Sequence, residues 1–120
     1  PVYPYNKVTQ TESGHVIEID DTLGVERIAV EHRSGTFHEI HPDGSQVTRI
    51  VNDNYTVVCK DDEVWVGGKV NVKVLGDATF DVGGDAKITV AKTTAIESKE
   101  NLSVVAPQIS LDGTVIKLNS

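Results

Sequence analysis

Apolar residues recur every eight positions along the stretch from Val64 to Leu118. Five consecutive blocks read VWVGGKVN, VKVLGDAT, FDVGGDAK, ITVAKTTA and IESKENLS, followed by a shorter block, VVAPQIS, and by LDGTVIKL. The first and third positions of the blocks are mostly apolar, with a polar or variable residue between them. This alternation is typical of a short strand with one buried face. A repeat at a fixed period is a stronger indication of architecture than any single residue.

A sharp corner is expected after each of these short strands. The fifth position of three successive blocks is glycine, which accepts backbone angles that other residues avoid. One block therefore builds one edge of a polygon, and successive blocks wind about an axis. The predicted corners are Gly68, Gly76 and Gly84.

The blocks are too few for a single chain to enclose a core, because a solenoid generally needs three or more stacked turns. If three chains wind together, every strand pairs with strands of its neighbours and no lateral edge stays exposed. The pattern therefore predicts an all-β fold, an intertwined homotrimeric triple-stranded β-helix that forms a prism. The residues expected to fill its axis are Val64, Val66, Val72, Val74, Phe80, Val82, Ile88, Val90, Ile96, Val104 and Leu111.

Short alternating segments separated by turn signals precede the repeat and predict an antiparallel meander. The turn signals include Pro42-Asp43-Gly44. No ten-residue segment has a helical period, so almost no helix is expected. The expected organisation is an extended lead-in over 1–13, a meander over 14–60 and the prism over 61–120. The strands of the meander are expected at 15–20, 26–32, 36–41, 46–51 and 55–60.

Composition narrows the possible functions. The formal net charge is −7, which argues against nucleic acid as a partner. No apolar run is long enough for a membrane-spanning helix, and no signal peptide is visible. Cys59 is the sole cysteine, so neither a disulfide framework nor a cysteine zinc site is expected, and a buried, inert thiol is predicted. Because the chain starts at Pro1 without an initiator methionine, it is expected to be a fragment of a longer protein.

The octads and the upstream stretch SGHVIEIDDTLGVERIAVEHRSGTFHEIHPDGS resemble a known family. Both are similar to the C-terminal triple-stranded β-helix of the central spike (tail-lysozyme) proteins of T-even-type myophages and to the related VgrG spikes of type VI secretion. The residues that carry this resemblance are Ser13-Gly14-His15, Glu18, Asp20-Asp21-Thr22, Arg27, His32-Arg33-Ser34-Gly35 and His41-Pro42-Asp43-Gly44.

The resemblance implies a structural role in a virion, as the shaft of a membrane-piercing central spike in the baseplate of a contractile phage tail. It implies upstream lysozyme and oligonucleotide/oligosaccharide-binding-like domains in the full-length chain, to which any hydrolase activity would belong. It also implies a PAAR-repeat tip protein seated on the blunt C-terminal end, with Val115, Ile116 and Leu118 as the platform. A fragment of a type VI secretion VgrG-like spike, and a glycan-binding or depolymerising trimeric tail fibre, stay open as alternatives.

The titratable residues do not indicate an enzyme. His38 and His41 are three apart on a predicted strand, so they point to opposite faces and are not expected to chelate together. Some members of the family hold iron through a His-x-His motif, which this sequence lacks. Carboxylates such as Glu18, Asp20 and Glu39 are expected in salt bridges or in solvent, because a filled prism offers no pocket for a catalytic pair. No catalytic residue, cofactor or metal ligand is predicted, and an ion held on the threefold axis is left as a minor alternative.

Overall fold

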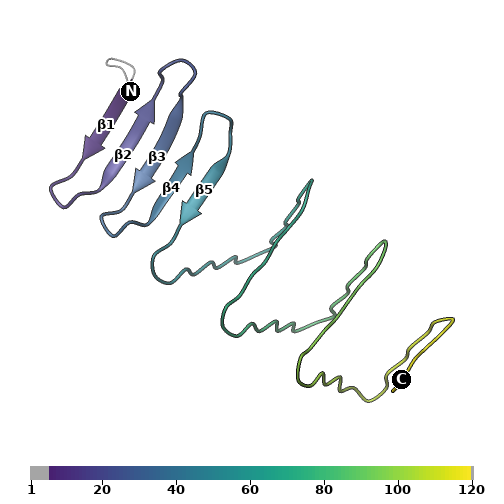
Figure 1. Ribbon diagram of the computed structural model, residues 1–120. Coiled ribbons are helices and arrows are strands. Elements are labelled where there is room, and N and C mark those ends of the chain that lie inside the picture. Colours follow the sequence, from purple (N-terminus) through teal and green to yellow (C-terminus); the bar gives the residue numbers. More distant parts are fainter. Residues whose placement is uncertain (1–5, 120) are drawn as a thin grey trace. The chain divides into compact units, whose positions relative to one another are not determined.

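A computed structural model describes residues 6–119, and within that range it contains five β-strands and no helix. The strands form one antiparallel sheet in the order β1-β2-β3-β4-β5, so neighbours in sequence are neighbours in space (Figure 1). The predicted all-β fold with an antiparallel meander is confirmed, while the trimeric assembly stays a prediction. The strand bounds are β1 Asn6–Gln10, β2 Val16–Asp20, β3 Arg27–Glu31, β4 Phe37–Ile40 and β5 Gln46–Arg49.

Three of the four hairpin turns share one backbone geometry. In the turn His41–Ser45, the His41 amide donates to the Ser45 carbonyl at 2.9 Å and the Gly44 amide donates to the His41 carbonyl at 2.9 Å. The turns over 11–15 and 32–36 repeat this pair of bonds. Gly44 has a φ of 87°, in the left-handed region that favours glycine. This arrangement is a type I turn followed by a glycine bulge, one of the common ways of joining two antiparallel strands.

The register of β2, β3 and β4 gathers apolar residues on one side of the sheet, opposite a polar face that carries Glu18 and Glu39. Ile19 pairs with Ile28, which pairs with Ile40. Ile17 pairs with Val30 in the next row on the same side. We call these five residues the isoleucine face. On the opposite side, Glu18 pairs with Ala29 and Ala29 with Glu39, so the period-two alternation of the strands holds across the sheet.

The sheet differs from the predicted meander at both ends. β1 lies within the segment expected to be a lead-in; its sequence NKVTQ has one apolar residue, so its pairing with β2 does not appear as alternation. The part of the expected lead-in before Asn6 lies outside the described residues. At the other end the sheet stops at Arg49, and the expected strand over 55–60 is not among the strands of the described chain.

The chain after β5 consists of extended segments separated by bends. The chain as a whole divides into two compact units, 1–69 and 70–120, and the first of them contains the sheet. In the first unit, bends follow the sheet at 51–52, 59–60 and 67–68. In the second, bends occur at 75–76, 83–84, 91–92 and 99–100, and then at 107 and 114. The eight-residue spacing therefore begins directly after the sheet, earlier than the predicted start at Val64.

These bends do not use left-handed backbone angles. The glycines with φ between 86° and 98° are Gly14, Gly24, Gly35 and Gly44, which all lie in hairpin turns. None of the octad glycines has a left-handed φ, and the same bend occurs at Ala91-Lys92. The expectation that glycine is needed at the octad corners for its backbone angles was therefore wrong. This also explains why the first two bends, at Val51-Asn52 and Cys59-Lys60, carried no glycine signal.

Candidate interaction surfaces

The backbone of residues 50–119 forms no hydrogen bond with other backbone groups of the described chain. No strand pairing among the described residues involves it either. The Val51 amide donates to the Thr36 hydroxyl at 3.2 Å, which anchors the start of the first extended segment to the β3–β4 turn. Extended backbone presents a row of amide and carbonyl groups that pair with other strands whenever such strands are within reach.

The apolar octad positions are exposed together with this backbone. Phe80 and Ile88, at the first position of their blocks, are 86% and 88% exposed, and Val82, at the third position, is 44% exposed. The other residues predicted to fill the axis are exposed as well: Val64, Val66, Val72, Val74, Val90, Ile96, Val104 and Leu111. We call this set the octad stripe. A monomeric protein rarely exposes so many large apolar side chains, and such exposure normally marks an interface.

The predicted corners lie at bends. The bends at 67–68, 75–76 and 83–84 contain Gly68, Gly76 and Gly84. A Cβ atom added at any of these three glycines would meet nothing of its own chain within 4 Å. Neither backbone angles nor crowding within the chain therefore requires glycine at these positions.

The predicted tip platform is also exposed. Val115, Ile116 and Leu118 lie on the last extended segment, beyond the bend at Thr114. Gly113 precedes this bend, and a Cβ added to it would lie 3.7 Å from the Val115 carbonyl and 3.9 Å from the Ile116 side chain. The chain therefore turns tightly just before the platform residues.

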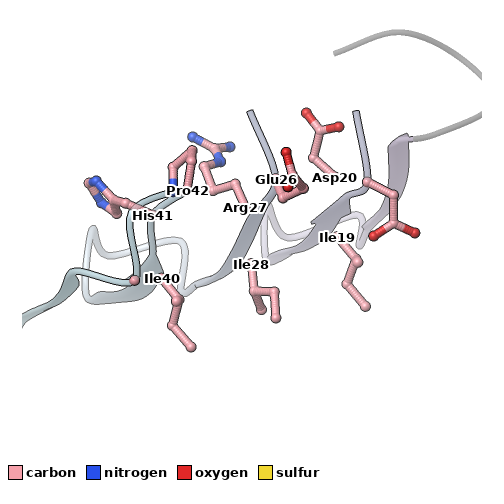
Figure 2. Close-up of a pocket in the computed structure, with 10 residues that line it drawn as sticks. Ile19, Asp20, Glu26, Arg27, Ile28, Ile40, His41 and Pro42 are labelled. Atoms are coloured by element: carbon pink, nitrogen blue, oxygen red, sulfur yellow. The ribbon is translucent and has the colours of Figure 1, made fainter. Parts of the chain in front are cut away.

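The sheet contributes a second apolar surface. Ile17, Ile28 and Val30 on the isoleucine face are about half exposed. Figure 2 shows Ile19, Ile28 and Ile40 pointing to one side of the sheet and Asp20, Arg27 and His41 pointing to the other. Ala29, on the polar face, is the buried apolar residue of the described chain, so the sheet has almost no core of its own.

The polar face is organised around Arg27. Its guanidinium forms an ion pair with Glu18, and its other terminal nitrogen lies 4.0 Å from the Glu39 carboxylate. Glu39 in turn accepts a hydrogen bond from Nε2 of His41 at 3.1 Å. The hydrogen bond to Glu18 is the main reason that the pKa of Arg27 is raised. Because the small residue Ala29 lies between the two glutamates in the register, the arginine can reach both of them.

Two aspartates stabilise turns. Asp20 accepts a hydrogen bond from the Thr22 amide at 2.9 Å, and Asp43 accepts one from the Ser45 amide at 2.9 Å. Hydrogen bonds from the Thr22 side chain and then its amide lower the pKa of Asp20. Bonds from the Ser45 amide and then its hydroxyl lower the pKa of Asp43. Both carboxylates are therefore turn residues, and the expectation that Asp20 lies in a salt bridge or in solvent was wrong.

The histidines do not gather into a metal centre. No group of three or more histidine, cysteine or acidic side chains with metal-binding geometry occurs among residues 6–119. His38 bonds to the Thr48 hydroxyl at 2.7 Å, and His41 bonds to Glu39. The contact between His15 and His32, whose ring centroids are 4.5 Å apart, was not predicted from the sequence. That contact could have been found, because the two residues begin and end adjacent predicted strands.

Cys59 lies at a bend and is exposed in the single chain. The expectation of a buried thiol is therefore not met by this chain alone. The structure also contains, within residues 6–119, no helix that is long and apolar enough to cross a membrane.

Comparison with known proteins identifies relatives in phages. No protein-family model matches the chain. Protein Gp5 of Vibrio phage KVP40 is 56% identical over 78 residues, which make up 65% of this chain and 18% of that protein. The pre-baseplate central spike protein Gp5 of Enterobacteria phage T4 is 38% identical over 82 residues, 68% of this chain and 13% of that protein.

The chain thus spans less than a fifth of the length of either of these curated relatives. The similarity confirms the resemblance to central spike proteins that the octads and the meander indicated. Over about two thirds of its length, this chain is a homologue of the phage Gp5 proteins, one of which is a pre-baseplate central spike protein.

Proposed function

We propose that this chain is the shaft of the central spike in a phage tail baseplate and acts as a homotrimer. The observation that carries the proposal is a combination found in the described residues 50–119. Their backbone forms no hydrogen bond with other backbone groups of the chain, and they expose an apolar stripe with an eight-residue period. The name of the T4 relative, a pre-baseplate central spike protein, supports the baseplate location and favours a phage spike over a type VI spike or a glycan-binding fibre.

Three intertwined copies would pair the free backbone groups of residues 50–119 and bury their apolar stripe. Strands of one copy pair with strands of the other two, which satisfies the backbone amides and carbonyls. The three octad stripes meet on the common axis and exclude water from it. The exposed isoleucine faces provide further apolar surface for contact between the copies. At the octad corners, the space beside Gly68, Gly76 and Gly84 is then available to a neighbouring chain.

The function of such a shaft is mechanical. Contraction of the tail would drive it along its axis into the host envelope, and continuous hydrogen bonding between chains around a dry axis would resist buckling. Its formal charge would be three times −7, or −21, which keeps an exposed rod soluble. In this role the chain itself carries no catalysis.

The C-terminal end of the shaft is proposed to carry a tip protein. A trimer exposes three copies of Val115, Ile116 and Leu118 at its end, and uncovered strand ends of this kind promote aggregation. A PAAR-repeat protein, the partner implied by the resemblance, would cover these side chains. Replacing Leu118 by Asp should abolish its binding in a pull-down assay with the purified tip protein. Thr89→Asp adds the same charge far from the end and should bind normally.

The oligomeric state tests the proposal directly. Light scattering on the purified chain should give three times the chain mass of 13.0 kDa, about 39 kDa. The trimer should persist in mild SDS, because intertwined chains cannot separate without unfolding. A mass of 13.0 kDa would refute the proposed assembly and function together.

A further inference from the structure

Four charged side chains of the octads lie at matching positions of neighbouring blocks. Lys73 and Asp81 each lie two residues before a bend of the chain. Lys92 and Glu100 are each the second residue of a bend. Each of these lysines is therefore followed, eight residues later, by a carboxylate in the same place of the next block.

These four side chains have no charged partner among the described residues of the single chain. All four residues are exposed, and none of them forms an ion pair or a hydrogen bond with another described residue. Lys73 and Asp81 each lie between two residues of the octad stripe, so alternation directs them to the side opposite the stripe. In the proposed trimer that side faces solvent, where charged groups of different copies can meet.

The order of the strands on one face of the prism follows from three equal copies that share one axis. Each copy turns once per octad, so it moves to another face of the three-sided prism with every block. After one block, each copy lies on the face that a neighbouring copy has just left. One octad of a copy therefore lies beside the next octad of its neighbour, and residue i of one strand lies beside residue i+8 of the other. Paired strands are roughly 4.8 Å apart, a distance at which facing charged side chains interact.

We propose that Lys73 of each copy pairs with Asp81 of a neighbouring copy, and Lys92 with Glu100, and that these ion pairs select an offset of eight residues between the copies. This inference rests on the proposed homotrimer. Without an offset, each lysine would lie beside the same lysine of another copy, and with an offset of 16 Lys73 would lie beside Thr89. Opposite charges on facing strands stabilise their pairing and like charges destabilise it, so the offset of eight is the most favourable of the three.

Within 70–119, one pair at the same spacing carries like charges. Asp77 and Asp85 are eight residues apart and lie beside each other in this register. The neighbour of Asp85 on its other side is Thr93, which is uncharged. Asp85→Asn should therefore raise the melting temperature of the trimer, because it removes a repulsion and breaks no ion pair. An unchanged or lower melting temperature would contradict the register.

Cysteine cross-linking of the full 120-residue chain measures the offset directly. Cys59 is first replaced by serine, and Lys73→Cys and Asp81→Cys are then combined. Copper-catalysed oxidation should join the copies, so that a boiled sample on a non-reducing gel contains covalent dimers and trimers. A disulfide joins Cα atoms roughly 4.4–6.8 Å apart, so it can link adjacent strands but not strands two spacings apart. Lys73→Cys alone, and Lys73→Cys with Thr89→Cys, are the matched controls and should run as single chains.

Charge reversal tests whether the ion pairs stabilise the trimer. Lys73→Glu should lower the melting temperature, and the addition of Asp81→Lys should restore it. Lys87→Glu changes the net charge equally, but Thr79 and Ala95, eight residues to either side, are uncharged, so this variant should melt close to the original protein. The difference between the two variants should shrink in about 0.5 M salt, because salt screens exposed charges. Equal melting temperatures for Lys73→Glu and Lys87→Glu would overturn the ion pair.

Light scattering on each variant separates a failure of the register from a failure of the proposed function. A mass of about 39 kDa, three times 13.0 kDa, with a covalent link between positions 73 and 81 supports the register. Lys92→Cys with Glu100→Cys should link in the same way. At the same mass, a link in the Lys73→Cys single variant, or no link in either cysteine pair, would overturn the register and leave the trimer standing. A mass of 13.0 kDa for the original protein would overturn both.

Discussion

Phe80 and Trp65 form a matched pair for testing which residues face the axis. In the single chain they are 86% and 88% exposed, so contacts within the chain do not distinguish them. Phe80 belongs to the octad stripe, whereas Trp65 follows Val64 and is expected, by alternation, to point away from the proposed axis. We therefore expect Phe80→Ala to weaken the assembly strongly and Trp65→Ala to leave it almost unchanged.

The expected magnitudes differ by several kcal/mol. Truncating a fully buried phenylalanine to alanine costs about 3–5 kcal/mol. A trimer loses three such side chains, so the free energy of unfolding falls by roughly 9–15 kcal/mol per trimer if the copies act independently. Substitution of an exposed side chain usually changes stability by no more than about 0.5 kcal/mol. If the protein were an isolated chain, both substitutions would change its stability by no more than about 0.5 kcal/mol.

The assay is guanidinium unfolding at several protein concentrations, with light scattering to follow the mass. Phe80→Ala should shift the midpoint to lower denaturant at every protein concentration. Trp65→Ala should follow the original curve. Equal shifts would refute the assignment of the stripe to the axis. A large shift for Trp65→Ala alone would show that the opposite side of the octads faces inward.

Three further predictions concern the sheet. Gly44→Ala should destabilise the protein by about 1–2 kcal/mol in thermal unfolding, because φ at this position is left-handed; equal stability would contradict that turn geometry. Arg27→Met should cost about 1 kcal/mol or less, since it leaves Glu18 and Glu39 without their shared cation; if Glu18→Gln suppresses this loss in a double-mutant cycle, the ion pair is its cause. The pKa of Asp43 is lowered from its ordinary value of 3.8 by the Ser45 bonds, so its contribution is complete above pH 3.8 and is lost as the pH falls through the lower folded-state value. Acid unfolding of Asp43→Asn should lack this component, and an identical acid profile would contradict the role of the carboxylate.

Much of the sheet could be predicted from the sequence because alternation and turn chemistry agree there. The strands expected over 26–32 and 36–41 correspond to β3 and β4, with ends that differ by one residue. Each is flanked by a turn whose glycine has a left-handed φ, and such a glycine is a clear sequence signal for the end of a strand. β1 could not be predicted in the same way, since what identifies it as a strand is its pairing with β2 and not its own residues.

The eight-residue spacing of bends begins earlier than the first block expected from the sequence, because the first two bends contain no glycine. The glycine corners favoured a first block at Val64, yet the same bend occurs at Val51-Asn52 and at Cys59-Lys60. Because the bends need no left-handed angle, local residue preference does not specify them. The eight-residue spacing is the more general signal, and it is carried by the apolar positions between the bends.

The unpaired backbone and the exposed apolar side chains of the octads recur as regularly as the bends themselves. The hairpin turns supply their own hydrogen bonds, through Asp20, Asp43 and the two histidines, and these bonds need no second molecule. The octads, in contrast, leave backbone groups and apolar side chains open at the same period, bend after bend. Unpaired strands and apolar residues that recur every eight positions are best matched by a partner with the same spacing. Another copy of the same chain is the simplest such partner. The sheet is therefore expected to take its local shape early in folding, whereas the octads should acquire strand structure only as the copies associate. Circular dichroism of a dilute, newly refolded chain should accordingly show a strand signal that grows with protein concentration, and a signal independent of concentration would contradict this order of events.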